Sequence, residues 1–417
     1  MEIKRDRYLN RLISRERNGM AKVITGMRRC GKSYLLFNLF RDHLLNSGIK
    51  DDHIVCISLD SLENEPLLDV NRLYSTIKGS IKDDDQYYIL LDEIQLVDRF
   101  EKMINSLLRM DNVDIYVTGS NSRMLSTDII TEFRGRTDEV RVMPLSFSEY
   151  VAAYDGTSEE AWESYLEYGG LPEILLMKDD EQRSSYLTNI LKKTYVKDIL
   201  ERYDIRSPSA LNGIFDVLSS SVGSLTNPKR LKDTLRTKGF NTVDDSTVNS
   251  YIRYLEDAFL FEKSDRYDVK GRSYFGTPVK YYATDIGIRN ARLNFRQIEE
   301  THLMENIIYN ELRSRGFSVD VGVVDFTETI DGKRVKRHVE IDFVANKGRI
   351  RHYIQSAYMM DSEKREIEIR PFLKVNDSFR KFIIINGKSR PRIDDHGIIT
   401  MGIIDFLMDE EILEKPF

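Results

Sequence analysis

Over the first 145 residues of the chain, the apolar and polar positions form two alternating patterns, which are short apolar runs and amphipathic segments. Amphipathic segments separate short apolar runs, and the segment 33–48 ends in Asn46-Ser47-Gly48, which is a helix stop signal. Strands that alternate with helices in this way predict a parallel sheet with helices on both of its faces. The five apolar runs with the length of buried strands are 21–25, 54–60, 87–92, 113–119 and 139–145.

The middle of the chain changes to a mainly helical pattern. Residues 148–203 form a helical series that is interrupted at Gly169-Gly170, and we interpret this segment as a lid. Residues 204–283 contain three short helices followed by a hairpin pattern, which predicts a winged helix. In one of these helices the apolar residues Val248, Ile252 and Leu255 share a face.

The last third of the chain mixes helix and strand. A helical pattern ends at Gly316, and two alternating segments are joined by Asp331-Gly332, a strong hairpin signal. On the returning strand Glu340 and Asp342 lie on one face, because side chains in a strand repeat every two residues. The predicted fold is α/β throughout, and its domains are 1–147, 148–203, 204–283 and 284–417.

Composition limits the kind of protein that this sequence encodes. With 417 residues, 41% hydrophobic and 31% charged, it has the composition of a soluble protein of two or three domains. No apolar run approaches the ~18 residues of a membrane span. Two cysteines, Cys30 and Cys56, build no disulfide framework, so we expect a cytoplasmic location and no membrane partner. The net charge of -6 opposes a surface that coats nucleic acid along its whole length.

A phosphate-binding motif lies between the first predicted strand and helix. The segment from Gly26 to Ser33 matches G-x-x-x-x-G-K-[ST], the Walker A pattern. Glycines let the backbone approach phosphate, Lys32 reaches the β- and γ-phosphates, and the Ser33 hydroxyl ligates Mg²⁺. The candidate nucleotide contacts are Gly26, Met27, Arg28, Arg29, Cys30, Gly31, Lys32, Ser33 and Tyr34.

An acidic pair follows the third apolar run and completes the expected site. Asp92 is a candidate ligand of Mg²⁺, and Glu93 is a candidate general base that orients the attacking water. The next run ends in small polar residues, of which Ser120 is our first candidate for a γ-phosphate sensor and Asn121 the second. The sequence has no [NT]-K-x-D motif for reading guanine, so ATP is the expected nucleotide.

Two arginines are candidates for contact with the γ-phosphate. Arg134 and Arg136 flank Gly135 just before the fifth apolar run. An arginine that reaches the γ-phosphate, from the same subunit or a neighbour, stabilises the charge of the transition state. Either residue fits this role, but both arginines could equally be surface residues that form salt bridges. The oligomeric state is left open.

The predicted winged helix suggests DNA as one partner and protein as another. The segment around Lys229 and Arg230 carries five basic residues against one acid, as expected for contact with phosphates. The following helix carries Glu256 and Asp257, which favour a joint between proteins. Both partner classes stay open on the residues alone.

The layout of 284–417 is similar to the PD-(D/E)xK nuclease fold. That resemblance implies a metal site with one glutamate on a helix, an aspartate on a strand, and E-x-K on the next strand. Glu305 and Asp342 occupy the first two positions, whereas Gln355 and Ala357 occupy the last two. A glutamine is a poor ligand for Mg²⁺ and alanine carries no cation, so we expect a catalytically degenerate site unless Lys347 or Lys364 substitutes.

The motifs in this order resemble one family nearly end to end. "ITGMRRCGKS", "ILLDEIQ", "VTGSNSRML", "FRGRTDEVRVMPLSFSEY", "GGLPEI", "YYATDIGIRNARL", "HLMENIIYNELRSRGF" and "VEIDFVA" are similar to the blocks of bacterial and archaeal AAA-type ATPases with a C-terminal domain of unknown function. The resemblance implies ATP binding, a winged helix and a nuclease-like end domain. Many members carry E-V-K where this chain has "QSA", which weakens the case for cleavage.

Three functional hypotheses follow. The first is a Mg²⁺-dependent ATPase whose nucleotide state switches its C-terminal domains for engagement of a partner or nucleic acid. The second is a DNA-binding module in which ATP acts as a conformational ligand. The third, an ATP-gated nuclease, is opposed by Gln355 and Ala357.

Overall fold

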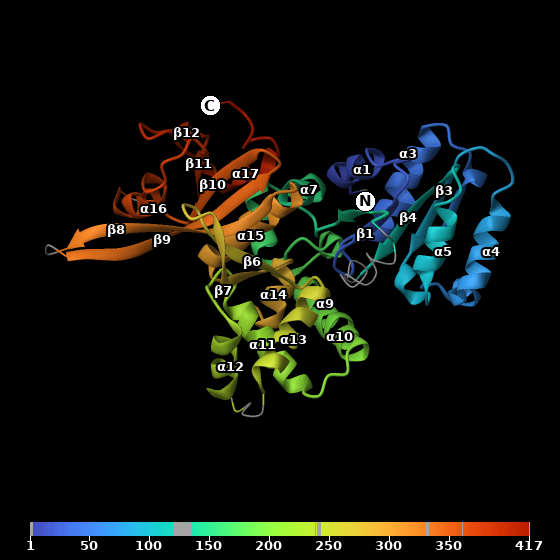
Figure 1. The fold of residues 1–417 in the computed structure, drawn as a ribbon, viewed down its shortest axis with the longest axis horizontal. Helices are drawn as coiled ribbons and strands as arrows, with labels where there is room; N and C mark the ends of the chain where they lie inside the picture. Colours follow the sequence, from blue (N-terminus) through green and yellow to red (C-terminus); the bar gives the residue numbers. More distant parts are fainter. Residues whose placement is uncertain are drawn as a thin grey trace. The chain divides into compact units, whose positions relative to one another are not determined.

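The computed structural model of the chain describes residues 3–120, 133, 135–237, 239, 243–330, 333–360 and 362–416 (Figure 1). The candidate residues Asn121 and Arg134 lie outside the described residues, and so does the side chain of Lys364. The chain divides into two compact units. Unit 1 contains residues 1–144 and 257–259, and unit 2 contains residues 145–256 and 260–417.

Unit 1 alternates strands and helices as the hydrophobic pattern predicts. Its strands are β1 (Ala21–Thr25), β2 (Ile54–Ser58), β3 (Tyr87–Asp92), β4 (Val113–Gly119) and β5 (Thr137–Arg141). Its helical segments are α1 (Asp6–Ile13), α2 (Lys32–Tyr34), the π-helical η1 (Leu35–Phe40), α3 (Arg41–Asn46), the 3₁₀ turns η2 (Asp51–His53), η3 (Leu62–Leu68) and η4 (Ile94–Leu96), and the helices α4 (Val70–Ser80) and α5 (Phe100–Leu107).

The five strands form one parallel sheet in the order β2-β3-β4-β1-β5. This confirms the predicted parallel sheet, and its order brings the carboxyl ends of β1 and β3 to either side of β4. The helix after β1 runs without a break through α2, η1 and α3, and it ends before Gly48, which has φ +90°. Only the fifth strand differs noticeably from its expected position, because β5 begins at Thr137 and ends at Arg141.

Both faces of this sheet are buried. On β3, Tyr87, Ile89 and Leu91 belong to a core shared with α4 and α5. The alternate residue Tyr88 faces the other side, where the ring of Phe40 lies 6.4 Å from it. Side chains that alternate between two buried faces explain why β1, β3 and β4 are buried at every position.

Unit 2 contains all the remaining elements. Its helical segments are α7 (Phe147–Ala153), α8 (Ser158–Tyr168), η6 (Pro172–Leu176), α9 (Asp180–Ile190), the π-helical η7 (Leu191–Val196), α10 (Lys197–Arg202), α11 (Pro208–Ser220), α12 (Pro228–Thr237), α13 (Asp245–Asp257), α14 (Ile286–Arg292), α15 (Glu300–Ser314), α16 (Ser362–Leu373) and α17 (Ile403–Met408). Its strands are β6 (Phe261–Asp268), β7 (Ser273–Ala283), β8 (Ser318–Ile330), β9 (Lys333–Lys347), β10 (Ile350–Ala357), β11 (Arg380–Ile385), β12 (Arg392–Ile393) and β13 (Ile398–Gly402).

An eight-stranded sheet organises unit 2 in the order β12-β13-β11-β10-β9-β8-β6-β7. The hairpin of β6 and β7, which the sequence assigns to the wing of a winged helix, continues the sheet because β6 pairs in parallel with β8. Apart from 257–259, the residues assigned to 148–203, 204–283 and 284–417 therefore belong to one compact unit. Their division into three domains stays a prediction.

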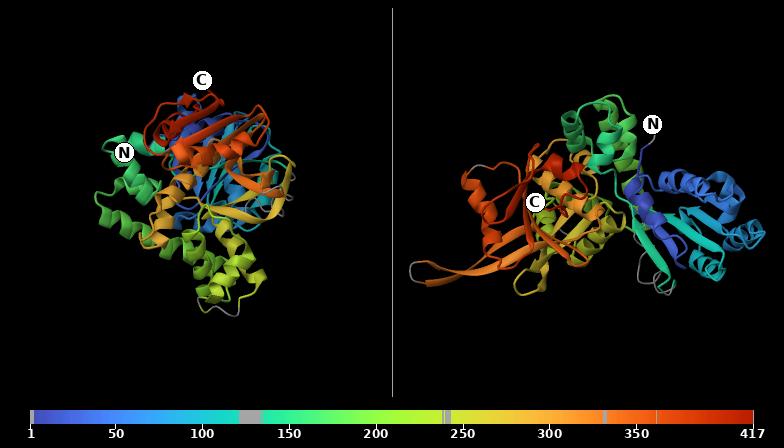
Figure 2. Two further views of the ribbon diagram at one scale, coloured as in Figure 1. Left: turned by 90° about the vertical axis from the view of Figure 1, so that its left-hand side faces the viewer. Right: turned by 90° about the horizontal axis from the view of Figure 1, so that it is seen from above.

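The antiparallel strands β8 and β9 pair as far as Ile330 and Lys333, as the expected hairpin requires. Their ends project from the rest of unit 2 as a two-stranded ribbon, seen in orange in Figure 1 and again in the right-hand view of Figure 2. A shift of register near Asp320 and Gly322 marks a bulge at the base of this ribbon.

Candidate functional site

The loop after β1 has the backbone that a phosphate-binding loop needs. Gly26 has φ +145°, and a Cβ at this position would lie 2.2 Å from the carbonyl oxygen of Val142. Gly31, directly before α2, has φ +94°. Only glycine adopts such backbone angles without strain, and only glycine fits beside Val142. The two glycines of the motif are thus required by local geometry.

Lys32 lies inside this loop. Its side chain is buried, and its ammonium donates hydrogen bonds to the carbonyl oxygens of Gly26 and Met27, both at 3.0 Å. These two partners are neutral, so an anionic phosphate oxygen would be a stronger partner for the ammonium. Ser33 is exposed at the start of α2, next to Lys32.

Arg5, which was not among the candidates from the sequence, fixes the position of the loop after β1 by hydrogen bonds to backbone carbonyl groups. Its buried guanidinium donates to the carbonyl oxygens of Cys30 at 2.9 Å and Met143 at 2.7 Å. The Cys30 thiol is buried and donates to the carbonyl oxygen of Val142 at 3.4 Å. The side chain of Cys30 therefore packs against the protein and leaves only its backbone for a ligand.

Asp92 ends β3 and is almost fully buried. The Thr118 hydroxyl on β4 donates to its carboxylate, and the Ser33 hydroxyl also hydrogen-bonds it. Burial raises the pKa of Asp92 above its ordinary value, although these hydroxyl contacts counteract the rise. A buried carboxylate beside a serine hydroxyl offers the hard oxygen ligands that Mg²⁺ prefers, so the residues fit the expected ion.

Glu93 stands directly after Asp92 in a left-handed conformation with φ +54°. Its backbone N–H donates to the Thr118 hydroxyl at 3.0 Å, and its carboxylate accepts hydrogen bonds from Gln95 and, at 3.2 Å, from Ser120. The structure thus brings Ser120 and Glu93 together, as expected for two residues at adjacent strand ends. Thr118, which links both acids, was missed because a threonine within a strand carries no signal in the sequence.

Arg136 lies at the opposite end of the sheet. Its carbonyl oxygen accepts a hydrogen bond from the N–H of Ala21, the first residue of β1, whereas the phosphate-binding loop follows the last residue, Thr25. Four steps of extended strand separate these ends by about 13 Å. The exposed Arg136 is therefore placed away from the loop of its own chain, because parallel strands put their two ends on opposite edges.

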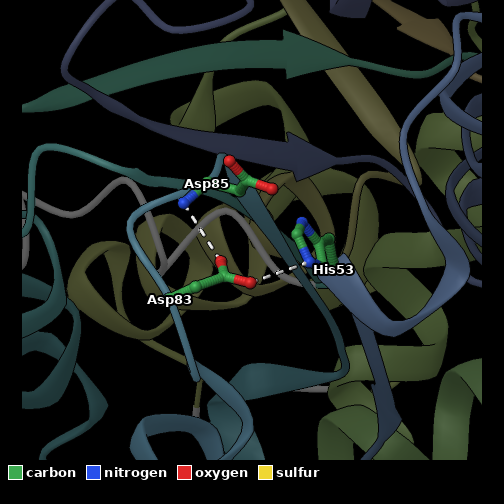
Figure 3. Close-up of side chains that lie close together, drawn as sticks. All are labelled: His53, Asp83 and Asp85. Atoms are coloured by element: carbon green, nitrogen blue, oxygen red, sulfur yellow. Dashed lines mark hydrogen bonds and ion pairs between the residues drawn. The ribbon is translucent and has the colours of Figure 1, made fainter.

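A histidine and two aspartates form a further cluster at this same opposite edge (Figure 3). Nε2 of His53 lies 3.6 Å from Oδ2 of Asp83, whose other oxygen accepts the N–H of Asp85 at 3.0 Å. Lys50 pairs with Asp85 at 3.3 Å. The three side chains offer ligand atoms within 4.8 Å of one another, but both aspartates are exposed and each already has a partner.

The strongest electrostatic feature of unit 2 surrounds Lys280 on β7. Its buried ammonium lies 2.9 Å from Oε1 of Glu305, 2.8 Å from Oε1 of Glu340 and 3.9 Å from Oδ1 of Asp342. The Tyr282 hydroxyl also donates to Glu305, at 2.7 Å. Burial acts to lower the pKa of Lys280, but the charges of Glu305, Asp342 and Glu340 outweigh it and raise the pKa. Burial and the charge of Glu305 raise the pKa of Asp342.

The predicted nuclease-like residues are only partly gathered at this cluster. Glu305 and Asp342 belong to it, and Oε1 of Gln355 accepts the N–H of Asp342 at 3.3 Å. Ala357 packs in the apolar core beneath α16. Lys347 pairs instead with Glu414 at 3.6 Å, so it does not supply the missing cation. The cation that does lie beside Glu305 and Asp342 is Lys280, from a strand that the sequence places in another domain.

The basic helix of the predicted winged helix is α12. It borders a surface hollow of about 390 Å³ lined by Asn227, Lys229, Arg230, Asp233, Thr234 and Thr237. Lys232 on the same helix pairs with Asp245 at 2.6 Å. Lys229 and Arg230 of α12 are therefore exposed, whereas Lys232 is neutralised within unit 2.

Within the described residues, no helix combines the length and the apolar character needed to cross a membrane.

Two family models match parts of the chain. Residues 18–151 match an AAA domain, and residues 159–299 match a domain of unknown function, DUF8612. The first match covers the loop after β1, both acids and the strand that ends at Gly119. It agrees with the predicted AAA-type core.

Relatives extend over most of the chain. An uncharacterized protein of Haemophilus influenzae is 32% identical over 412 residues, which cover 97% of this chain and 98% of the relative. Uncharacterized protein MJ1544 of Methanocaldococcus jannaschii is 29% identical over 399 residues, 90% of this chain and 84% of the relative. The crystal structure of Cdc6p from Pyrobaculum aerophilum matches 73% of this chain and 94% of that chain, with 12% identity and a TM-score of 0.30.

Proposed function

The chain belongs to the family that includes the Haemophilus influenzae protein, and on that premise we propose that it is an AAA-type ATP hydrolase that works with Mg²⁺. We propose further that the nucleotide state of unit 1 switches unit 2 for engagement of a partner or of nucleic acid. The AAA domain and the parallel sheet of unit 1 support nucleotide binding. The switching of unit 2 and a cytoplasmic location are proposals from the sequence.

One observation carries the proposal of ATP hydrolysis. Lys32, Asp92 and Glu93 stand at the carboxyl ends of β1 and β3, with only β4 between these strands. Open parallel sheets bind their ligands at this edge. The buried ammonium of Lys32 suits a phosphate, and the buried carboxylate of Asp92 suits Mg²⁺. The carboxylate of Glu93, which accepts hydrogen bonds from Ser120 and Gln95, suits the attacking water.

The residues of the chain have distinct roles in this proposal. Lys32 exchanges its two carbonyl partners for phosphate oxygens, and the glycines let backbone N–H groups face the phosphates. Ser33 and Asp92 would hold Mg²⁺, which neutralises phosphate charge when bound. Glu93 accepts the proton of the attacking water, and Ser120 fixes the orientation of its carboxylate.

An arginine for the γ-phosphate is proposed to come from a neighbouring copy of the chain. Arg136 lies at the far edge of the sheet of its own chain, so in cis it is badly placed for this contact. Arg134 is the other candidate. With Arg136 in this role, hydrolysis would depend on assembly of two or more copies of the chain.

A second candidate function is a DNA-binding module in which ATP acts as a conformational ligand. The exposed basic residues of α12 favour it. An ATP-gated nuclease has the least support, because Gln355 and Ala357 stand where the nuclease pattern needs an acid and a cation. A winged helix at 204–283 and a degenerate nuclease-like domain at 284–417 remain part of the proposal.

Phosphate release from ATP tests the proposed function directly. In Lys32→Ala we expect nucleotide affinity to fall at least about tenfold, because a charge-assisted contact is lost. In Glu93→Gln we expect ATP binding to be kept while turnover falls about 10²-fold or more, because the general base is removed. Glu65→Gln removes an exposed carboxylate elsewhere in unit 1 and should change neither value.

Two results would overturn the proposal. One is wild-type protein that is folded by circular dichroism and shows no heat on titration with ATP and Mg²⁺. The other is a Glu93→Gln variant that turns over ATP at the wild-type rate. Adding duplex DNA separates the two candidate functions, since turnover that rises with DNA favours the DNA-binding module and turnover that ignores it favours a switch for a protein partner.

A further inference from the structure

The ribbon that projects from unit 2 is an arm whose two strands extend beyond the rest of the sheet. The paired register of β8 with β6 ends at Val323, and that of β9 with β10 ends at Phe343. Beyond these points residues 324–330 and 333–339 pair only with each other in the described strands, over seven residue pairs. We call this segment the β8–β9 arm. At about 3.3 Å per residue it extends about 20 Å.

The two faces of the arm differ in what covers them. One face carries Phe326 and Glu328, and α16 packs against it. Arg370 of α16 lies 5.3 Å from the Phe326 ring and pairs with Glu328 at 3.6 Å, and Arg337 pairs with the same glutamate at 3.5 Å. The charges of Glu328 and Arg337 on this face are therefore engaged within unit 2.

The other face is open. Thr329 is opposite Arg334, Thr327 is opposite Lys336, and all four residues are exposed. Within the described part of the chain, neither Arg334 nor Lys336 forms an ion pair. Lys270 adds a third cation at the base of the arm, where it donates to the carbonyl oxygen of Asp325 at 2.7 Å.

We propose that this open face of the β8–β9 arm binds the phosphate backbone of a nucleic-acid duplex through Arg334 and Lys336. Alternate residues of a strand are about 6.6–6.8 Å apart, so the two cations span about two successive phosphates of one strand. The threonine hydroxyls between them are donors of the kind that contact phosphate oxygens.

Strand β9 connects the open face of the arm to the cluster around Lys280. Arg334, Lys336 and Glu340 lie on the same face of the strand, because only an odd number of residues separates each from the next. The open face of the arm therefore continues along β9 to Glu340, which pairs with Lys280. The inference names a partner for the switch proposed above and rests on that proposal only for coupling to ATP, since binding itself needs no nucleotide.

The test is fluorescence anisotropy with a labelled random duplex of ~20 base pairs, without nucleotide, between about 50 and 200 mM salt. For the double variant Arg334→Gln/Lys336→Gln we expect affinity at the lowest salt to fall about tenfold or more. The slope of log K against log salt should become shallower by about 2, because two phosphate contacts are lost. Duplex DNA and duplex RNA are both titrated, since they share the phosphate chemistry.

Arg337→Gln is the matched control. It makes the same charge change on the same strand, but its side chain is on the covered face and pairs with Glu328, so we expect less than about a twofold loss. Equal losses in both variants, or an unchanged slope in the double variant, would overturn the proposal. So would wild-type protein that binds anionic vesicles as tightly as duplex. ATP turnover without nucleic acid should be unchanged in the double variant, which separates a failure of this inference from a failure of the ATPase.

Discussion

Nζ of Lys280 on β7 lies 2.9 Å from Oε1 of Glu305 on α15, and the two residues are 25 positions apart in sequence. The contact is buried, and with Glu340 and Asp342 it forms a cluster of three carboxylates around one ammonium. The cluster ties the edge hairpin of the sheet to α15 and β9. It holds the only cation that we find among the described ion pairs of Glu305 and Asp342.

Replacing Lys280 with methionine should strongly destabilise unit 2. The substitution keeps the length of the side chain but leaves buried carboxylates without a counter-ion, a change that costs about 3–5 kcal/mol. Urea unfolding followed by tryptophan fluorescence measures this cost, because the chain has a single tryptophan, Trp162, and it lies in α8 of unit 2.

Lys263→Met is the control for this prediction. Lys263 lies on the neighbouring strand β6 and pairs with Asp265 at 3.0 Å, but its side chain is 44% exposed, so we expect a loss below about 1 kcal/mol. A Lys280→Met protein as stable as wild type would show that the cluster contributes nothing to the fold.

Asp285 should make unit 2 more stable as the pH falls. This buried residue precedes α14 and accepts the backbone N–H groups of Gly170 and Ile288, both at 2.9 Å. Burial outweighs these hydrogen bonds and raises the pKa of Asp285 to about 6. The folded state thus binds a proton that the unfolded chain releases near pH 4, so the contribution is complete below pH 4 and is lost as pH rises through 6.

The comparison with Asp285→Asn isolates this effect. Between pH 7 and 4 the stability of wild type relative to the variant should increase by about 3 kcal/mol. Urea unfolding at several pH values, with Trp162 as the probe, provides the measurement. A difference that stays constant over this range contradicts the assignment.

His352 on β10 should have the opposite dependence on pH. Its ring lies between Phe317 and Phe382, and within the described residues neither ring nitrogen has a hydrogen-bond partner. Burial lowers the pKa of His352 to about 4. In the unfolded chain the His352 imidazole binds a proton near pH 6.5, whereas in the folded chain it stays neutral until about pH 4. Stability is therefore lost as the pH falls from 6.5 to 4.

His352→Leu removes both the titration and the unsatisfied nitrogens. At pH 7 we expect the variant to be as stable as wild type or more stable, since a buried polar group without partners is unfavourable. At pH 4 it should gain about 3 kcal/mol relative to wild type. Loss of stability at both pH values would mean that the imidazole makes a contact that leucine cannot replace.

Gly26→Ala should abolish nucleotide binding without unfolding unit 1. The new Cβ would meet the carbonyl oxygen of Val142 at 2.2 Å, so the loop must move away from its position beside β5. Gly19→Ala is the matched control, because Gly19 also has a positive φ, +74°, but no atom lies within 4 Å of its Cβ position. The control should lose only about 1 kcal/mol of stability and keep its affinity for ATP, measured by calorimetry.

The sequence by itself determined the nucleotide-binding part of this protein. The expected strands of unit 1 are short apolar runs that alternate with helices, so their parallel pairing follows from local pattern. Gly26 to Ser33 form a contiguous motif that follows one strand, Asp92 ends another strand, and Glu93 follows it. Their place at one edge of the sheet could therefore be predicted without knowledge of distant contacts. The side of the sheet on which Arg136 lies also follows from direction alone, once β5 is known to be parallel to β1.

Only the tertiary structure decided what completes each site. Thr118 joins Asp92 to Glu93 from β4, and Lys280 enters the cluster of Glu305 and Asp342 from a hairpin that the sequence had assigned to a wing. Both depend on which strands pair, and pairing between distant segments is set by the burial of whole faces rather than by any local signal. A lysine in a strand predicts an exposed side chain, and only the carboxylates that the fold gathers around Lys280 allow its charge to be buried.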